Sequence, residues 1–460
     1  AGMQFVERAS WIPSLNAHYL VGIDGIAALF PPLTALLFCG VILSSWTSIQ
    51  SMPRLYFALL LGLESATMGV FCALDLVLFF LFWELTLVPI YFLVSLWGIG
   101  PERRFAAVKY TLFMLAGGIP LLFAILLLGL YPTDGAGTLI FDYPTLLEKP
   151  LPSALQATVF LLLFVGFAVK APLFPFHTWL PTVLREGPVG LSALLVGLKL
   201  GAFGILRFAV PLAPTAAREY FWLMAGLGLF GMLYGALVAL RQSNLRLMLA
   251  FSSVSHVGLV IVGIAAMNVQ GVQGAIFQLV NFSVVAGGLL LLTGFLHHRL
   301  GSTDLASLGG LVRPLPRLTA FFLLLGMASI GLPGTNGFVA ELLILIGVFI
   351  VAYFKFTWSL GVGCRAGRDS GRGVFFGFLS ASVFGAGDRS CGGLCGGSSA
   401  ARIVSRRRDG VAGVGRWFIP QLGSGRDGDR DGCLGETSRG RSAIRRERGT
   451  NPSLPWQNWG

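Results

Sequence analysis

Apolar runs long enough to cross a bilayer recur along the first 360 residues of the chain and are separated by Pro, Gly and charged residues. A membrane-spanning helix needs about twenty consecutive apolar residues. The pattern therefore predicts an all-α polytopic membrane protein with about eleven spans. We expect these spans near residues 26–48, 55–73, 74–97, 105–130, 154–173, 190–210, 220–240, 246–266, 271–296, 317–332 and 336–358.

Composition supports lipid as the surrounding medium. Of the 460 residues, 55% are apolar and only 12% are charged. A soluble globular protein carries about 25% charged residues, so a soluble fold is excluded. The sequence opens with AGMQFVERASWIP, which has neither a basic head nor an apolar core, so we expect a loop over residues 1–25 and no signal peptide.

The net charge of +12 is concentrated near the C-terminus and does not indicate a nucleic-acid partner. Residues 361–460 contain 23 Gly, 16 Arg and no Lys, with no sustained apolar period. Such a composition cannot bury enough apolar surface to offset chain entropy. Two interpretations stay open, a disordered tail or a change of reading frame near Val351. We assign no function to this segment, and its cysteines have no recognisable metal-ligand spacing.

Basic residues between the predicted spans fall mostly on one side. If the spans alternate in direction, that side holds Arg54, Arg103, Arg104, Arg185, Arg241, Arg246, Arg299, Arg313 and Arg317. Cytoplasmic or stromal loops are enriched in Lys and Arg. We therefore place residues 1–25 on the opposite, periplasmic or lumenal side.

Five ionisable residues lie inside predicted spans. They are Glu84, Lys170, Lys199, His256 and Glu341. Each costs about 2.5–3.5 kcal/mol at the middle of a membrane. A structural ion pair, or a core histidine with its hydrogen bonds satisfied, explains any one of them alone. Acids, amines and an imidazole spread over separate helices instead favour a proton relay.

The residue types suit such a relay. Burial weakens the hold of a lysine on its proton and a nearby carboxylate restores it, whereas arginine stays charged. If Lys170 faces Glu84, separating the two would let Lys170 pass a proton to Lys199.

Two of these helices carry interruptions. Pro172 and Pro175 follow Lys170, and the stretch GLPGTNG precedes Glu341. Backbone groups freed by such breaks survive at membrane depth only inside protein or beside water. Broken spans in corresponding positions of two halves indicate inverted repeats and a transport path. A Pro kink that serves packing alone is the alternative.

At these residues the sequence resembles the antiporter-like, proton-translocating membrane subunits of complex I, of the M or D type (subunit 4). The resemblance rests on LDLVLFFLFWELTLVPIYFLVSLWG, FAVKAPLFPFHTWLP, LLVGLKLGAFGILRF, LAFSSVSHVGLV and GLPGTNGFVAELLIL, and it covers roughly residues 5 to 350. It implies two inverted five-helix repeats with broken helices. We expect peripheral helices over 26–73, the first repeat over 74–210, and an incomplete second repeat over 220–358.

The resemblance also implies a role for each residue. Glu84 resembles the glutamate that pairs with the broken-helix lysine, here Lys170. Lys199 resembles the central lysine, and His256 the histidine of the connecting path. Glu341 resembles the terminal glutamate, which distinguishes this subunit from siblings that have lysine there. His177 matches the first histidine after the broken helix.

The resemblance further implies that the chain carries no redox cofactor or metal. No ligand set for haem, iron–sulfur, flavin or metal is visible in residues 1–360, where the cysteines are Cys39 and Cys72. NAD(P)H or ferredoxin, plastoquinone and iron–sulfur clusters would belong to partner subunits. The other expected partners are the membrane-arm subunits, including sibling antiporter-like chains, and lipid.

Two departures from the family pattern bear on the subtype. After HTWLP the text reads TVLREGPVG, and the later helix reads QLVNFSVVAGG, with Asn281 and Phe282 where a His-Gly pair is usual. The second stretch is more similar to variant cyanobacterial D-type chains. It implies a thylakoid membrane, with a bacterial plasma membrane as the alternative, and a partner module that hydrates carbon dioxide.

Two other functions stay open. One is a subunit of a multisubunit sodium/proton antiporter, which shares the Glu and Lys pair and the broken helices but more often has Lys at the position of Glu341. The other is a membrane scaffold whose interior charges are silent.

Overall fold

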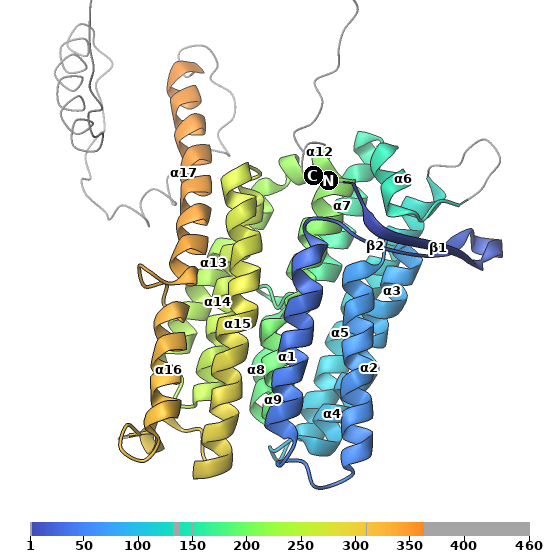
Figure 1. Ribbon diagram of the computed structural model, residues 1–460. Coiled ribbons are helices and arrows are strands. Elements are labelled where there is room, and N and C mark those ends of the chain that lie inside the picture. The colour runs from blue at the N-terminus through green and yellow to red at the C-terminus, as the bar shows by residue number, and fades with distance from the viewer. Residues whose placement is uncertain (1, 132–138, 150, 310, 363–460) are drawn as a thin grey trace, which may run out of the picture. The chain divides into compact units, whose positions relative to one another are not determined.

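The computed structural model describes residues 2–131, 139–149, 151–309 and 311–362. The helices of this part lie side by side along a common direction (Figure 1). Two residues of the predicted Gly/Arg-rich tail, 361 and 362, end the last helix; the disorder and reading-frame interpretations of the rest lie outside the described residues.

The N-terminal segment corrects the loop expected over residues 1–25, while the all-α membrane fold stands. Instead of a loop it forms an antiparallel hairpin of β1 (Gln4–Ile12) and β2 (Ala17–Ile23), joined by the short helix η1 (Pro13–Leu15) and by Asn16 in the left-handed conformation at φ 50°. Asn tolerates that conformation better than most residues. Buried and more exposed side chains alternate along much of β2, which is the period of a half-buried strand.

Nine helical segments in the described residues are long and apolar enough to cross a membrane. All nine lie within four residues of their predicted bounds at either end. They are Ala27–Ser45 (η2 and α1), Pro53–Cys72 (α2), Leu76–Trp97 (α3 and α4), Arg103–Leu130 (α5), Ser153–Lys170 (α7), Val189–Leu212 (α9 to α11), Phe221–Leu240 (α13), Leu245–Ala265 (α14) and Val269–Leu300 (α15).

The final two of the eleven predicted spans do not cross separately. They correspond to α16 (Pro316–Ser329) and α17 (Asn336–Val362), which follow one another along one line (Figure 1). With 14 residues, α16 is about 21 Å long and too short to cross a bilayer alone. We therefore interpret two shorter apolar stretches, Pro316–Ser329 and Asn336–Ala352, as pieces of one interrupted span that adds to the nine segments above.

Several helices are divided into pieces inside a span. The bounds of the divided and connecting pieces are α3 (Leu76–Leu85), α4 (Leu87–Trp97), α6 (Tyr143–Glu148), η3 (Phe176–Thr178), α8 (Trp179–Glu186), α9 (Val189–Gly197), α10 (Leu200–Gly204), η4 (Ile205–Ala209), α11 (Val210–Leu212), α12 (Pro214–Glu219) and η5 (Leu305–Ser307), with α1 at Phe30–Ser45. The segment η4 is a π-helix. Such bulges inside helices are frequent at functional sites.

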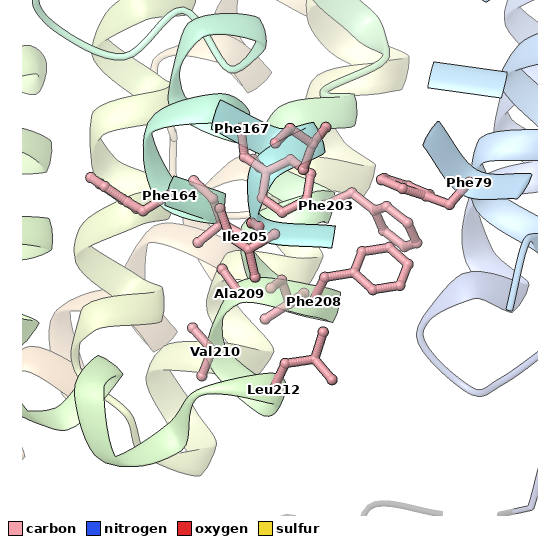
Figure 2. Packing of buried hydrophobic residues seen from close by; sticks show 14 of the residues in the cluster. Phe79, Phe164, Phe167, Phe203, Ile205, Phe208, Ala209, Val210 and Leu212 are labelled. Atoms are coloured by element: carbon pink, nitrogen blue, oxygen red, sulfur yellow. The ribbon is translucent and has the colours of Figure 1, made fainter. Parts of the chain in front are cut away.

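An aromatic cluster holds α3, η4 and α7 together (Figure 2). Phe79 of α3 lies 4.4 Å from Phe208 of η4 and 6.1 Å from Phe167 of α7 between ring centroids. All three side chains are at most 2% exposed. Aromatic pairs at such spacings contribute about 0.5–1.5 kcal/mol beyond the area they bury. The cluster fixes α3 against α7, and these two helices carry Glu84 and Lys170.

Candidate functional site

Lys170 reaches the turn of α3 that carries Glu84. Its Nζ donates to the carbonyl oxygen of Trp83 at 2.9 Å and to Thr86 Oγ1 at 2.8 Å, and it lies 3.9 Å from the centre of the Trp83 ring. The ion pairs among the described residues do not include Glu84 with Lys170. The lysine thus contacts the residues on either side of the glutamate rather than its carboxylate.

Glu84 points from α3 into the face of α5. A Cβ atom placed on Gly118 of α5 would collide with Glu84 Oε1. Gly118 is buried near the middle of that helix. The absence of a side chain there therefore provides the space that the carboxylate occupies.

Lys199 lies in a break that the sequence analysis did not anticipate. It follows the end of α9 and precedes α10, with φ −90° and ψ 61°, and is only 4% exposed. The backbone beyond it packs tightly on the end of α7, because a Cβ on Gly201 would collide with Ala171 N and with the carbonyl oxygen of Phe167. Ala171, which follows Lys170, is therefore adjacent to Gly201, which lies just beyond Lys199.

The row of polar groups continues from Lys199 onto α14. Lys199 Nζ donates to Ser253 Oγ at 2.5 Å. One turn further along the same helix, His256 Nδ1 lies 2.8 Å from the carbonyl oxygen of Ser252. A carbonyl can only accept, so Nδ1 carries the hydrogen and Nε2 is the acceptor of the neutral ring.

Glu341 ends the row. Its Oε1 lies 3.8 Å from His256 Nε2, which faces it from α14. The carboxylate is held by the interruption between α16 and α17, since Gly331, at φ +73°, has no room for a Cβ beside Glu341 Oε2. The structure thus brings the second broken span to the histidine, as the proton-relay hypothesis requires.

Phe282 is one of the two residues, with Asn281, that stand where the resemblance implies a His-Gly pair. Its ring centre lies 5.3 Å from Lys199 Nζ and 4.9 Å from the His256 ring centre. On the same helix, Asn281 Oδ1 and Gln278 Oε1 are buried with no hydrogen-bond partner among the described residues. Buried polar atoms of this kind are sites where ordered water binds.

His177 is not brought into this row. Its ring lies against Phe174, Tyr234 and Phe251, at centroid distances of 5.7, 5.1 and 6.3 Å. It is 4% exposed, and its Nδ1 is buried with no hydrogen-bond partner in the described part of the chain. Of the six predicted site residues, His177 is the one that the described contacts do not connect to the row.

Two charged residues that the sequence analysis passed over form an ion pair in which the arginine is buried and the aspartate is 21% exposed. Arg207 of η4 is 1% exposed and its Nη1 contacts Asp24 Oδ1, which anchors the N-terminal segment. The backbone of Arg207 also accepts a hydrogen bond from Tyr143 OH at 2.7 Å. An arginine near the end of the predicted span 190–210, in LRFAV, was the signal that could have identified this pair.

A second polar cluster lies beside the hairpin. Single ligand atoms of His18, Asp75 and Asp142 lie within 4.8 Å of one another, an arrangement that could hold a metal ion. However, Arg8 Nη2 donates to Asp142 Oδ2 at 2.9 Å, and Asp75 accepts from the backbone N–H groups of His18, Val77 and Leu78. These contacts engage the carboxylates and favour a structural role.

The carboxyl group of Asp75 lies between two membrane-spanning segments. Burial raises the pKa of Asp75 above its usual value, and the hydrogen bonds from the backbone oppose that shift. The same side chain caps α3 at its first turn. Asp75 therefore fixes the start of the helix that carries Glu84.

The chemistry available along the row is proton transfer. Its two acids, two amines and imidazole can bind and release a proton near neutral pH when their surroundings are tuned. Its hydroxyl group can relay a proton because it both donates and accepts hydrogen bonds. The row passes from α3 and α7 through the α9–α10 break and α14 to α17. No part of it requires a bound redox group.

Comparison with known proteins agrees with this chemistry. Residues 73–364 match the family described as NADH:quinone oxidoreductase/Mrp antiporter, transmembrane. NADH-quinone oxidoreductase subunit M of Rhodobacter capsulatus is 40% identical over 360 residues, which cover 76% of this chain and 69% of that protein. NAD(P)H-quinone oxidoreductase chain 4 3 of Trichormus variabilis is 38% identical over 347 residues, which cover 75% of this chain and 64% of that protein.

Solved structures share the fold. A chain of respiratory complex I from Thermus thermophilus with bound NADH has a TM-score of 0.69 and 30% identity, covering 89% of this chain and 85% of that chain. A chain of the Mrp complex from Dietzia has a TM-score of 0.68 at 21% identity, over 90% of this chain and 55% of that one, and shows the fold alone. The chain therefore belongs to the antiporter-like membrane subunits, of the M or chain 4 type, of NAD(P)H-quinone oxidoreductase complexes.

Proposed function

We propose that this chain moves protons across the membrane for a complex I-type NAD(P)H-quinone oxidoreductase, while electron transfer to quinone takes place in partner subunits. The observation that carries the proposal is the row of interior acid and base groups. Members of this row on different helices lie close to one another. Lys199 bonds to Ser253 at 2.5 Å, and His256 lies 3.8 Å from Glu341. A merely structural set of charges would be expected to pair locally rather than to extend through the fold.

Within the row we assign each residue a role. Glu84 sets the charge at Lys170, which exchanges protons with Lys199, and His256 passes them on to Glu341. His177 has a weaker claim, because its contacts are aromatic, and we propose that it takes part only if water reaches its unpartnered Nδ1. These roles rest on the resemblance and on the contacts described above.

The proposal is tested in liposomes that contain the whole complex, by measuring quinone-dependent proton uptake with and without sodium. We expect uptake that does not depend on sodium. We expect Lys199→Ala to reduce it by about 100-fold or more, which is the range contributed by a positioned proton-transfer group. Lys199→Arg should not restore it, because arginine keeps its proton.

The remaining outcomes separate the alternatives. Sodium-dependent uptake would favour the antiporter. If Lys199→Ala assembled normally and pumped like the unmodified complex, the scaffold hypothesis would replace ours.

Gly118 offers a test of the space around Glu84. Gly118→Ala places a methyl group where the carboxylate of Glu84 lies, and overpacking of this kind costs about 1–3 kcal/mol. We expect lower proton uptake with the complex still assembled. Gly62→Ala is the control, since nothing lies within 4 Å of a Cβ there. Equal effects of the two changes would argue against a specific role for the Glu84 site.

A finer assignment rests on one stretch of sequence. The text VNFSVVAGG around Phe282 supports a cyanobacterial form with plastoquinone as the acceptor, in a thylakoid membrane, associated with carbon dioxide uptake. The identities to the Rhodobacter and Trichormus proteins, 40% and 38%, do not favour it over a bacterial plasma membrane. The neighbouring chains of the purified complex test it, because a zinc-bearing hydratase-like subunit would be present only in the carbon dioxide form.

A further inference from the structure

The hydrogen bond from Lys199 leads to a hydroxyl group rather than to another charge. Lys199 is 4% exposed and Ser253 is 1% exposed, and Nζ donates to Oγ at 2.5 Å. The ion pairs in the described residues do not involve Lys199. A proton that leaves this amine therefore has the Ser253 oxygen as its nearest acceptor.

An apolar ring lies beside both Lys199 and His256. The Phe282 ring contacts both, at 5.3 Å from Lys199 Nζ and 4.9 Å from the His256 ring. A phenyl ring has no lone pair or exchangeable hydrogen with which to pass a proton. A proton that moves between the two residues therefore cannot use this ring as a carrier.

Ser253 lies on the path around the ring. It is three residues before His256 on α14, so the two side chains share a face of the helix, one turn apart. A hydroxyl group both donates and accepts. We propose that Ser253 carries the proton from Lys199 to the His256 turn, past Phe282. This inference rests on the proposed function and adds a proton-carrying residue to it.

The step balances without an oxidant or reductant. An N–H bond of Lys199 breaks as a new O–H bond forms on Ser253, while the original hydroxyl proton leaves to a single bridging water. That water gives a proton to His256 Nε2, the nitrogen that faces Glu341. Rotation of the hydroxyl returns Ser253 to its starting orientation, and the starting state is restored when Lys199 regains a proton from Lys170 and His256 passes its proton to Glu341.

The first test compares three variants of the whole complex, scored as protons moved per quinone reduced. We expect Ser253→Ala to lower this ratio by about tenfold or more, since proton-transfer groups contribute at least that much. Ser253→Thr keeps the hydroxyl and should stay within about twofold. Ser255→Ala is the matched control, because its hydroxyl bonds to the carbonyl oxygen of Met232 on α13 instead.

A double variant, Ser253→Ala with Phe282→His, separates proton transfer from packing. Phe282→His puts an imidazole at the position that contacts both Lys199 and His256, so it should restore pumping to the Ser253→Ala complex. The inference is overturned if Ser253→Ala pumps normally, if Thr is as damaging as Ala, or if Phe282→His gives no rescue.

The same series distinguishes this inference from the proposed function. If Lys199→Ala stops pumping and Ser253→Ala does not, the Ser253 route is wrong and the proton-translocating function stands. If both variants pump normally while the complex assembles, the proposed function itself fails.

Discussion

We expect Glu84→Gln to lower proton uptake by the complex by about 100-fold or more, as for other positioned proton-transfer groups, while the chain remains assembled. The substitution keeps the size of the side chain that fills the space beside Gly118 but removes its negative charge. Lys170, which bonds to residues beside Glu84 in the chain, then loses the negative charge that attracts its ammonium group. Vesicle acidification and retention of the chain on native gels measure the two effects separately.

Lys170→Ala should lower proton uptake by as much as Glu84→Gln, because it removes the lysine on which Glu84 acts. It removes the ammonium group that bonds to Trp83 and Thr86. The control is Glu64→Gln, which removes a partly exposed carboxylate from α2. A loss of assembly in step with the loss of pumping would instead point to a scaffold role for the Glu84 region.

The second large effect concerns stability rather than pumping. We expect Asp24→Leu to destabilise the protein by about 3 kcal/mol, at the lower end for a buried pair that loses one partner. The reason is that Arg207, 1% exposed, would keep a buried charge without its carboxylate. Thermal denaturation of the detergent-purified complex, followed by release of the chain, measures the change.

A double substitution tests the cause. Asp24→Leu with Arg207→Met removes both charges, and replacing a whole buried pair by apolar groups is often neutral. We expect most of the lost stability to return. Arg8→Ala is the control, since its pair with Asp142 is 55% exposed on the arginine side and should contribute about 0–1 kcal/mol. If the double variant were no more stable than Asp24→Leu, the ion pair would not be the cause.

Much of the site was accessible from sequence because charge inside an apolar span is expensive and therefore conspicuous. Glu84, Lys170, Lys199, His256 and Glu341 stood out for that reason. The same argument should have identified Arg207, which lies in an apolar stretch of the same kind. Ser253 could not be found in this way, because a serine costs little in a helix and its importance comes from the lysine it faces.

The fold was predicted where local signals are strong and missed where they are weak. Spans such as Leu245–Ala265 follow from length and hydropathy alone. The hairpin of residues 4–23 was expected to be a loop, because its short alternation is masked by polar residues on the exposed strand. The division of the last span into α16 and α17 was read as two crossings, since hydropathy does not show how two pieces are aligned.

The sequence by itself determined that the chain lies in a membrane and which charges lie inside apolar spans, because these depend on hydropathy along the chain. Only the tertiary structure decided which of those charges meet. Lys170 contacts the residues beside Glu84, Lys199 bonds to Ser253, and Phe282 fills the space before His256. Such contacts join residues far apart in the chain, and the packing of helices, rather than any local pattern, sets them.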